Sequence, residues 1–232
     1  MGVEILASDA CLMFGDFVIG NHPPELLLTS LLAHRSMPRS VAGVCARAVG
    51  LTAVLWLAGC SSSAPLATFD LSSPSLEVKV RALKGVLSIA EPTASAPADS
   101  DRIVVRTSSS ALAVVKGAQW TERLPRLLQM RLIQTFENAK LLKSISRPGD
   151  GATADYALAW DLRRFEMNAT DNMARVEVSV RLLDTSGRII AAQIFVADAM
   201  GDASEGSAAA QALDAASNHV LRQIVIWSSG RV

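Results

Sequence analysis

DYALAWDLRRFEMNATDNMARVEVSVRLLDTSG, residues 155–187, is the stretch that decides the fold. Large apolar residues alternate here with small or polar ones, the apolar set being Tyr156, Leu158, Trp160, Leu162, Val176, Val178, Val180 and Leu182. This period of two predicts two strands, 155–167 and 174–184, each with one buried and one wet face. The turn residues 184–187 lead into a third strand, 188–197, so the three form an antiparallel meander.

Two segments on either side of this meander have helical periodicity. Apolar residues recur at steps of three and four before it, at Leu124, Leu127, Leu128, Leu132, Ile133 and Phe136. Pro125 is tolerated because it lies in the first helical turn, where its missing N–H has no partner to lose. A second stripe follows the meander, at Ala209, Leu213, Ala216, Val220, Ile224 and Trp227, on a long helix that starts near Ser204. Both segments are predicted to be amphipathic helices.

Shorter apolar runs add strands before the meander. We expect an edge strand at Thr68–Leu71, a strand at 86–89, a hairpin of 103–106 with 112–115, and a strand at 141–145. The segment 91–100 (EPTASAPADS) reads as a loop. A half-buried sheet and two amphipathic helices must cover each other. The predicted fold is therefore a two-layer α+β domain, mainly antiparallel sheet with the two helices packed on one face.

The segment from Met37 onwards has the pattern of a bacterial signal peptide. Arg39 and Arg47 form a short basic region before the apolar run 48–58, which is too short for a membrane-spanning helix. The run ends in Leu57-Ala58-Gly59-Cys60, which resembles the lipobox. We predict that a peptidase recognises Leu57, Ala58 and Gly59 and cuts once, before Cys60, whose thiol is acylated. The alternative is a cysteine that follows an apolar stretch by chance.

Residues 1–36 form a preface to a leader that is already complete from Met37. We interpret them as an upstream extension produced by a mis-assigned start, the alternative being an unusually long leader. Residues 37–59 are then the signal peptide, and 60–67 are the acylated cysteine with a Ser-rich tether. Since Ser61 rather than Asp follows the cysteine, we expect the mature protein to lie at the periplasmic face of the outer membrane.

Composition excludes several classes of function for the remainder. The 59 residues before Cys60 hold three of the 22 basic and four of the 22 acidic residues, so the mature part carries one excess positive charge. This near-neutral surface gives no case for nucleic acid. Cys11 and Cys45 lie in the leader, so no disulfide framework is expected after cleavage. Signatures of a P-loop, a nucleophile elbow and a dinucleotide-binding loop are missing from the sequence.

The remaining candidates for chemistry have plainer interpretations. His219 is the single histidine of the mature part and is more simply a helix-surface residue than a base. Asp99 and Asp101 resemble a metal pair, although carboxylates in such a loop are usually solvated. The tryptophans could line a lipid groove; Trp160 and Trp227 lie on stripes predicted to be core, and Trp120 is expected to be more open. We predict no catalytic residues, no metal site and no cofactor.

The order of these elements resembles the ABC-type transport auxiliary lipoproteins, the PqiC-like family. The segments that carry the resemblance are 68–71 (TFDL), 101–106 (DRIVVR), 120–128 (WTERLPRLL), 154–158 (ADYAL) running to Phe165, 182–187 (LLDTSG) and the closing helix to 227. The resemblance implies that 68–232 is a periplasmic, non-enzymatic auxiliary domain. It implies as partners a mammalian-cell-entry-domain protein with its ABC permease and ATPase, in a system that moves phospholipid or similar hydrophobic molecules between the two membranes.

Other functions remain open at this point. A lipoprotein assembly factor or a pilotin of another outer-membrane complex would share the anchor and differ in its partner. A periplasmic hydrolase would need a perturbed pair of carboxyl groups in a deep pocket. Unpaired sheet edges are usually covered, so we hypothesise that homo-oligomerisation or partner docking uses the edge at Thr68–Leu71.

Overall fold

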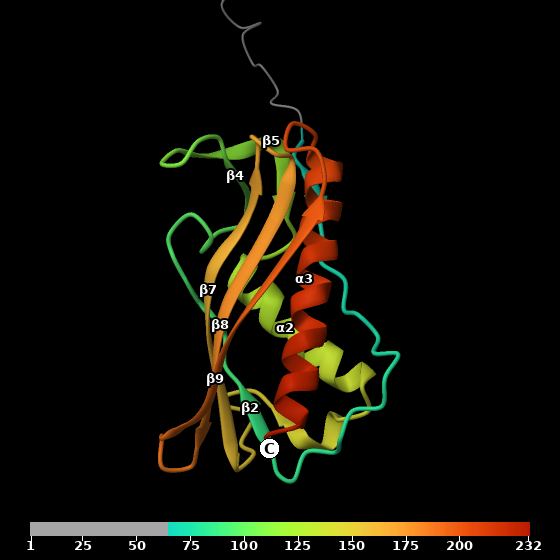
Figure 1. Ribbon diagram of the computed structural model, residues 1–232, viewed down its shortest axis with the longest axis vertical. Helices are drawn as coiled ribbons and strands as arrows, with labels where there is room; N and C mark the ends of the chain where they lie inside the picture. Colours follow the sequence, from blue (N-terminus) through green and yellow to red (C-terminus); the bar gives the residue numbers. More distant parts are fainter. Residues whose placement is uncertain (1–64) are drawn as a thin grey trace, which may run out of the picture. The chain divides into compact units, whose positions relative to one another are not determined.

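The computed structural model describes residues 65–232. The predicted extension, the signal peptide and the lipobox Leu57–Cys60 lie outside these residues. The described part is a curled mixed sheet with two α-helices packed on it, so the predicted α+β class is confirmed (Figure 1). No helix within residues 65–232 combines the length and the apolar character that crossing a bilayer requires.

The predicted meander is the longest part of the sheet. Strands β7 (Tyr156–Asn168), β8 (Met173–Asp184) and β9 (Ile189–Met200) pair antiparallel in sequence order. The pairing of β7 with β8 contains a bulge between Leu162 and Arg164. The bulge exchanges the two faces of β7, because side chains alternate along a strand and one extra residue shifts that alternation.

Shorter strands extend the sheet on the other side of β7. Through these strands and β7 the sheet has the order β1-β5-β4-β7-β2-β6, and β3 also pairs with β7. The strands are β1 (Ala67–Phe69), β2 (Leu87–Ile89), β3 (Thr93–Ala94), β4 (Arg102–Arg106), β5 (Leu112–Trp120) and β6 (Ile145–Ser146). Apart from the predicted hairpin β4–β5, these pairings are parallel, which makes the sheet mixed although its long ladders are antiparallel. The first strand is an edge strand, as predicted, and it lies beside β5.

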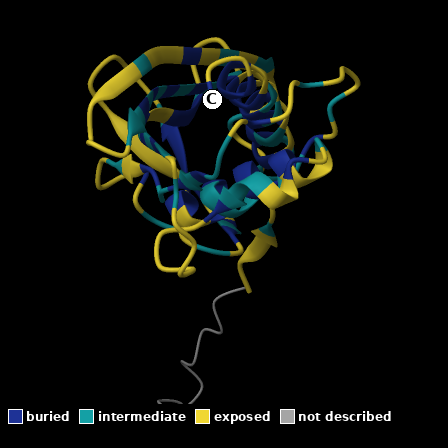
Figure 2. Cartoon of the chain, turned by 90° about the horizontal axis from the view of Figure 1, so that it is seen from below, coloured by how far each residue is buried: buried dark blue, intermediate teal, exposed yellow. Residues whose placement is uncertain are grey.

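The two helices cover the inner face of the sheet and contact each other. Helix α2 (Leu124–Asn138) has Pro125 in its first turn, and α3 (Gly206–Ser229) is capped by Glu205, whose side chain accepts hydrogen bonds from the first-turn amides. Both predicted apolar stripes are buried. Figure 2, a view along the long axis, shows buried residues gathered between sheet and helices and exposed residues on the outside.

The strand predicted at 141–145 is wrong. Lys140 adopts a left-handed conformation with φ 64 and ends α2. The chain then forms a 3-10 turn, Leu142–Ser144, and β6 has only two residues. The apolar residues suggested a strand, but Leu142 is 63% exposed, so this short run does not form a buried face.

Candidate functional site

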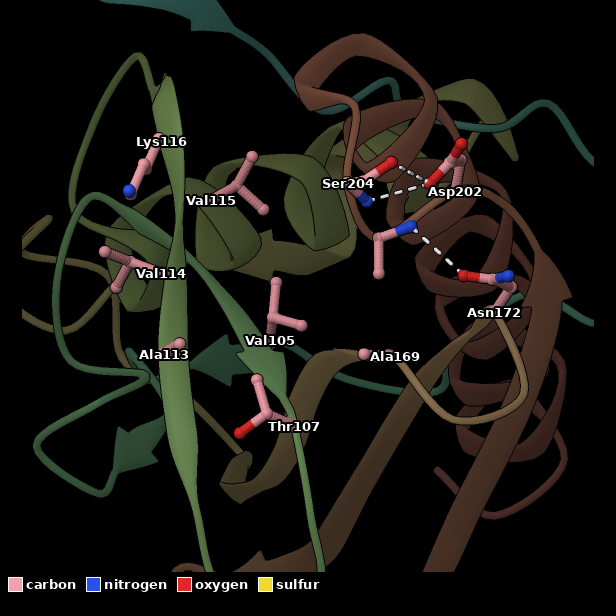
Figure 3. Close-up of a pocket in the computed structure, with 11 residues that line it drawn as sticks. Val105, Thr107, Ala113, Val114, Val115, Lys116, Ala169, Asn172, Asp202 and Ser204 are labelled. Atoms are coloured by element: carbon pink, nitrogen blue, oxygen red, sulfur yellow. Dashed lines mark hydrogen bonds between the residues drawn. The ribbon is translucent and has the colours of Figure 1, made fainter.

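A surface cavity, drawn in Figure 3, lies at the end of the domain where the chain enters β1. Its volume is about 640 Å³. Three segments line it, namely the hairpin β4–β5, the turn between β7 and β8, and the connection from β9 to α3. Gly206, the first residue of α3, lies against Phe69 of β1 and Val115 of β5, so the start of α3 and the first strand meet beside the cavity.

The apolar wall of the cavity results from a break in the β4–β5 ladder. Arg102 pairs with Gln119 and Val104 with Val114, so two steps along β4 correspond to five along β5. The extra residues of β5 include Gly117, whose φ of 73 is a conformation that glycine adopts at little cost. Val115 lies among these extra residues, and it lines the cavity together with Val105 of the neighbouring strand β4.

The polar rim is built from hydrogen-bonded loop residues. Asn172, with φ 54, accepts a hydrogen bond at its backbone oxygen from the Gly201 amide (3.0 Å) and at Oδ1 from the Ala203 amide (3.5 Å). Asp202 accepts from the Ser204 hydroxyl (2.6 Å) and amide (2.8 Å). The two bonds to Asn172 tie the turn after β7 to the loop before α3. Figure 3 shows the Ala203–Asn172 bond and the two Asp202–Ser204 bonds as dashed lines.

The carboxylates near the rim have structural partners. The Ser204 hydroxyl, and then its amide, lowers the pKa of Asp202. Hydrogen bonds from the Ser207 hydroxyl and from the Ala208 and Ser207 amides lower the pKa of Glu205. Both carboxyl groups are therefore ionised at neutral pH, whereas a general acid must carry a proton that it can donate. The site thus combines an apolar wall with hydrogen-bonding groups at its rim.

The wall strand β4 is held by an ion pair that the sequence did not indicate. Arg106 Nε lies 2.6 Å from Glu166 Oε1, and Arg106 Nη2 lies 2.9 Å from Oε2. Glu166 is buried, and the hydrogen bond to its carboxylate raises the pKa of Arg106. The pair joins β4 to β7 at the end of their short parallel ladder. Glu166 follows the bulge of β7, and only a disturbed alternation around Arg163-Arg164 could have suggested its position.

The residues proposed from sequence as candidates for chemistry lie apart from the cavity. Asp99 accepts a hydrogen bond from Arg123, and Asp101 lies 3.5 Å from Arg102, so each carboxylate has a different guanidinium as its partner. His219 is exposed on α3. Within the described residues, no cluster of three or more Cys, His, Asp or Glu side chains could hold a metal ion. Cys60 and the cleavage residues lie outside the described part.

The tryptophans belong to the core. Trp160 and Trp227 are 2% and 7% exposed, which confirms their predicted packing. The expectation that Trp120 is more open is wrong, because it is 1% exposed. Strand β5 continues five residues past the predicted hairpin and carries Trp120 inward, where its ring meets Phe165 edge-on at 5.8 Å. Trp120 and Trp160 line none of the described hollows, whereas one edge of Trp227 contributes to a shallow hollow between β9 and α3.

Comparison with known proteins identifies the family. Residues 69–225 match the family described as the ABC-type transport auxiliary lipoprotein component. The chain belongs to this family. The auxiliary family assignment covers the sheet and nearly all of α3, and it agrees with the resemblance found in the sequence.

Individual known proteins are similar to this chain in sequence or in fold. The uncharacterized protein bll6063 of Bradyrhizobium diazoefficiens is 32% identical over 175 residues, 74% of this chain and 47% of that protein. The chain thus spans about half the length of that relative. The crystal structure of XCC0632 from Xanthomonas campestris, of family DUF330, is similar with a TM-score of 0.64 at 26% identity over 71% of this chain and 96% of that one. An uncharacterized protein, with a TM-score of 0.55 at 13% identity over 70% of this chain and 97% of its own, shares the fold.

Proposed function

We propose that the protein is a non-enzymatic lipoprotein, anchored through Cys60 to the periplasmic face of the outer membrane. In this proposal it serves an ABC transporter with a mammalian-cell-entry-domain protein, which moves phospholipid or a similar hydrophobic molecule between the membranes. The observation that carries the proposal is a match to the auxiliary family over 69–225, directly after a lipobox and a short tether.

The described geometry supports an anchored orientation. The chain enters the fold at β1, at the same end of the domain as the start of α3 (Figure 1), and the cavity lies beside these two elements. Six residues, 61–66, separate Cys60 from Ala67, the first residue of β1, and the seven steps between them span at most about 25 Å when fully extended. An acylated Cys60 would therefore hold the cavity close to the bilayer surface. Each acyl methylene that enters the membrane stabilises this anchoring by about 0.8 kcal/mol.

The lining of the cavity supports an amphiphile as its ligand. Val105, Val115 and Ala113 provide an apolar wall, and Asn172 and Asp202 provide a rim of hydrogen-bonding groups. Such a combination of apolar surface with a few placed polar groups is typical of small-molecule sites. In the proposed role the cavity receives part of a lipid near the membrane that the protein serves.

Affinity capture from solubilised membranes tests the role. The full-length chain with a C-terminal tag is expected to co-purify the mammalian-cell-entry protein with its permease and ATPase. Capture of the subunits of an outer-membrane export machine would instead favour the assembly-factor or pilotin alternative. Absence of both groups of partners in mild detergent, together with an unchanged sensitivity of the deletion strain to detergents, would contradict the proposal.

Two matched cysteine variants test the anchor. Cys60→Ser is expected to remove the acyl mass and to release the protein from the membrane fraction. Cys45→Ser, in the predicted leader, is expected to leave acylation and membrane association unchanged. Intact mass spectrometry that found residue 60 unmodified in the wild type would refute the anchored model.

A further inference from the structure

The β4–β5 hairpin carries an uncharged and exposed surface. Residues 107–114 (TSSSALAV), which run from its turn into β5, include no charged side chain. Leu112 and Val114 are 42% and 49% exposed. Together with Val104 they line a hollow of about 410 Å³. Figure 3 shows Val114 and Val115 pointing to opposite sides of β5, so this hollow and the cavity beside Val115 face different sides of the strand.

The strand register places this surface on the outer face of the sheet. Val104 pairs with Val114, and Leu112 lies two residues before Val114, so the three side chains share one face. The residues that alternate with them, Val105 and Val115, belong to the core that the helices cover. The uncharged surface therefore faces away from α2 and α3.

The same outer face is charged where the meander forms it. The ion pairs there are Arg163–Glu177 at 3.1 Å, Arg175–Asp198 at 2.7 Å and Arg181–Asp161 at 2.6 Å. Charged groups lose hydration energy when they leave water, so this part of the face is suited to solvent. The hairpin part carries no such cost, and its apolar side chains gain free energy when they leave water.

The chain enters the domain beside this hairpin. Strands β1 and β5 are parallel, with Ala67 opposite Ala118, so the residues before Ala67 approach from the side at which β5 begins. Leu66, directly before β1, is also apolar and is 40% exposed. Leu112 lies six steps before Ala118, which is at most about 20 Å along β5. The tether from Cys60 to Ala67 spans at most about 25 Å, so the anchor and the hairpin lie within a similar distance of β1.

We propose that the outer face of the β4–β5 hairpin lies against the phospholipid leaflet that holds the acyl chains of Cys60, with Leu112 and Val114 in contact with hydrocarbon. The inference rests on the proposed function, which supplies the anchor. A domain on so short a tether meets its own leaflet at a much higher effective concentration than it meets any diffusing protein. Lys116, exposed on β5 two residues beyond Val114, is then at the level of the lipid phosphates.

This orientation brings the leaflet next to the cavity. The hollow on the outer face and the cavity of Figure 3 share Ala113 and Val114 among their lining residues. One strand therefore separates the lipid surface from the cavity that the proposed function assigns to part of a lipid. The hairpin is the contact between leaflet and cavity, at the place where a lipid leaves or enters the bilayer.

Fluorescence quenching in vesicles tests the contact. The full-length lipoprotein is reconstituted in vesicles of phosphatidylethanolamine and phosphatidylglycerol, with an environment-sensitive fluorophore on Ser110→Cys in the hairpin turn. Leu142→Cys is the control, because Leu142 is 63% exposed and precedes β6, at the opposite end of β7 from the hairpin. Nitroxide-labelled phosphatidylcholine in the vesicles is expected to remove most of the emission of the hairpin probe and to leave that of the control almost unchanged.

A double variant tests whether the apolar side chains hold the contact. Leu112→Ser/Val114→Ser, combined with the probe at residue 110, is expected to restore most of the quenched emission. Ile189→Ser/Ile190→Ser is a matched control on β9, since these residues are 53% and 42% exposed, and it should leave the quenching intact. If the first double variant lost its thermal unfolding transition, the comparison of the two probes in the otherwise unchanged protein would decide.

Flotation of the vesicles separates this proposal from the anchor. Protein that floats with the vesicles while both probes are quenched equally would overturn the membrane contact and leave the anchor standing. Protein that stays out of the floating fraction would overturn the anchor and the contact with it. A hairpin probe that is shielded from aqueous iodide but is not quenched by lipid would assign the surface to a protein neighbour, and it would also overturn the proposal.

Discussion

Removal of the Arg106 side chain tests how much the buried ion pair stabilises the cavity end of the sheet. In the Arg106→Ala variant, Glu166 loses two charge-assisted hydrogen bonds, of 2.6 and 2.9 Å. Its side chain is 8% exposed, so water cannot replace the lost partner fully. Leaving one member of a buried pair alone costs about 3–5 kcal/mol. We expect about 2–3 kcal/mol, because Arg106 itself is 26% exposed and the nearby Arg175 still attracts Glu166.

The same sheet provides a matched control. Arg175 and Asp198 form a similar two-bond pair, but their side chains are 38% and 33% exposed. Exposed pairs contribute about 0–1 kcal/mol, because water and salt screen them. Arg175→Ala should therefore destabilise the protein by no more than about 1 kcal/mol.

Urea unfolding of the full-length protein in mild detergent, followed by tryptophan fluorescence, measures both variants. A shift of the midpoint at constant slope reports the change in the free energy of unfolding. The double variant Arg106→Ala/Glu166→Ala should recover part of the loss, since it removes the unpaired buried charge. Equal costs for Arg106→Ala and Arg175→Ala would refute the reasoning that burial determines the strength of the pair.

Three further changes have defined outcomes. Trp120→Ala should cost about 3–5 kcal/mol in urea unfolding through the cavity it leaves, whereas Trp120→Phe should cost less than about 1.5 kcal/mol, since its buried Nε1 has no hydrogen-bond partner to lose. The Ser186 hydroxyl contributes most to lowering the pKa of Asp184 to about 2. The stability that this lowered pKa provides is complete above the pKa of the unfolded chain and is lost as pH falls through 2. The Asp184→Asn variant should therefore show a smaller fall in Tm between pH 5 and 2 than the wild type. Ala113→Trp should reduce the lipid that co-purifies with the protein, as measured by mass spectrometry, and Ala152→Trp, in an exposed loop away from the cavity, should not. An unchanged lipid content in the first of these variants would exclude the cavity as the lipid site.

The elements that could be predicted from sequence are those with long, regular periodicity. The strands β7 and β8 and both helices were predicted because one apolar face repeats over many residues. The run 141–145 has five residues, and so short a stretch does not distinguish a strand from a turn. Trp120 was misplaced for a related reason: Gly117 interrupts the alternation of β5, so the sequence shows a hairpin that ends early.

The cavity could not be predicted, because its parts come from segments far apart in sequence. Val105, Val115, Asn172 and Ser204 show no common motif. They meet because β4 pairs with the end of β7 and because Asn172 ties the turn after β7 to the loop before α3. The exposed edge of β9 was also hidden, since alternation in 189–200 is the same whether a strand lies inside a sheet or at its edge.

The sequence by itself determined the fold class, the family resemblance and the predicted site of acylation, because each depends on local patterns. These patterns are the periodicity along each helix or strand and the four adjacent residues Leu57–Cys60 at the end of an apolar run. The tertiary structure alone decided which strand is the free edge, where the cavity lies and which charges are buried together. Those properties depend on pairing between distant segments, and a single bulge or a single left-handed residue changes which side chains meet.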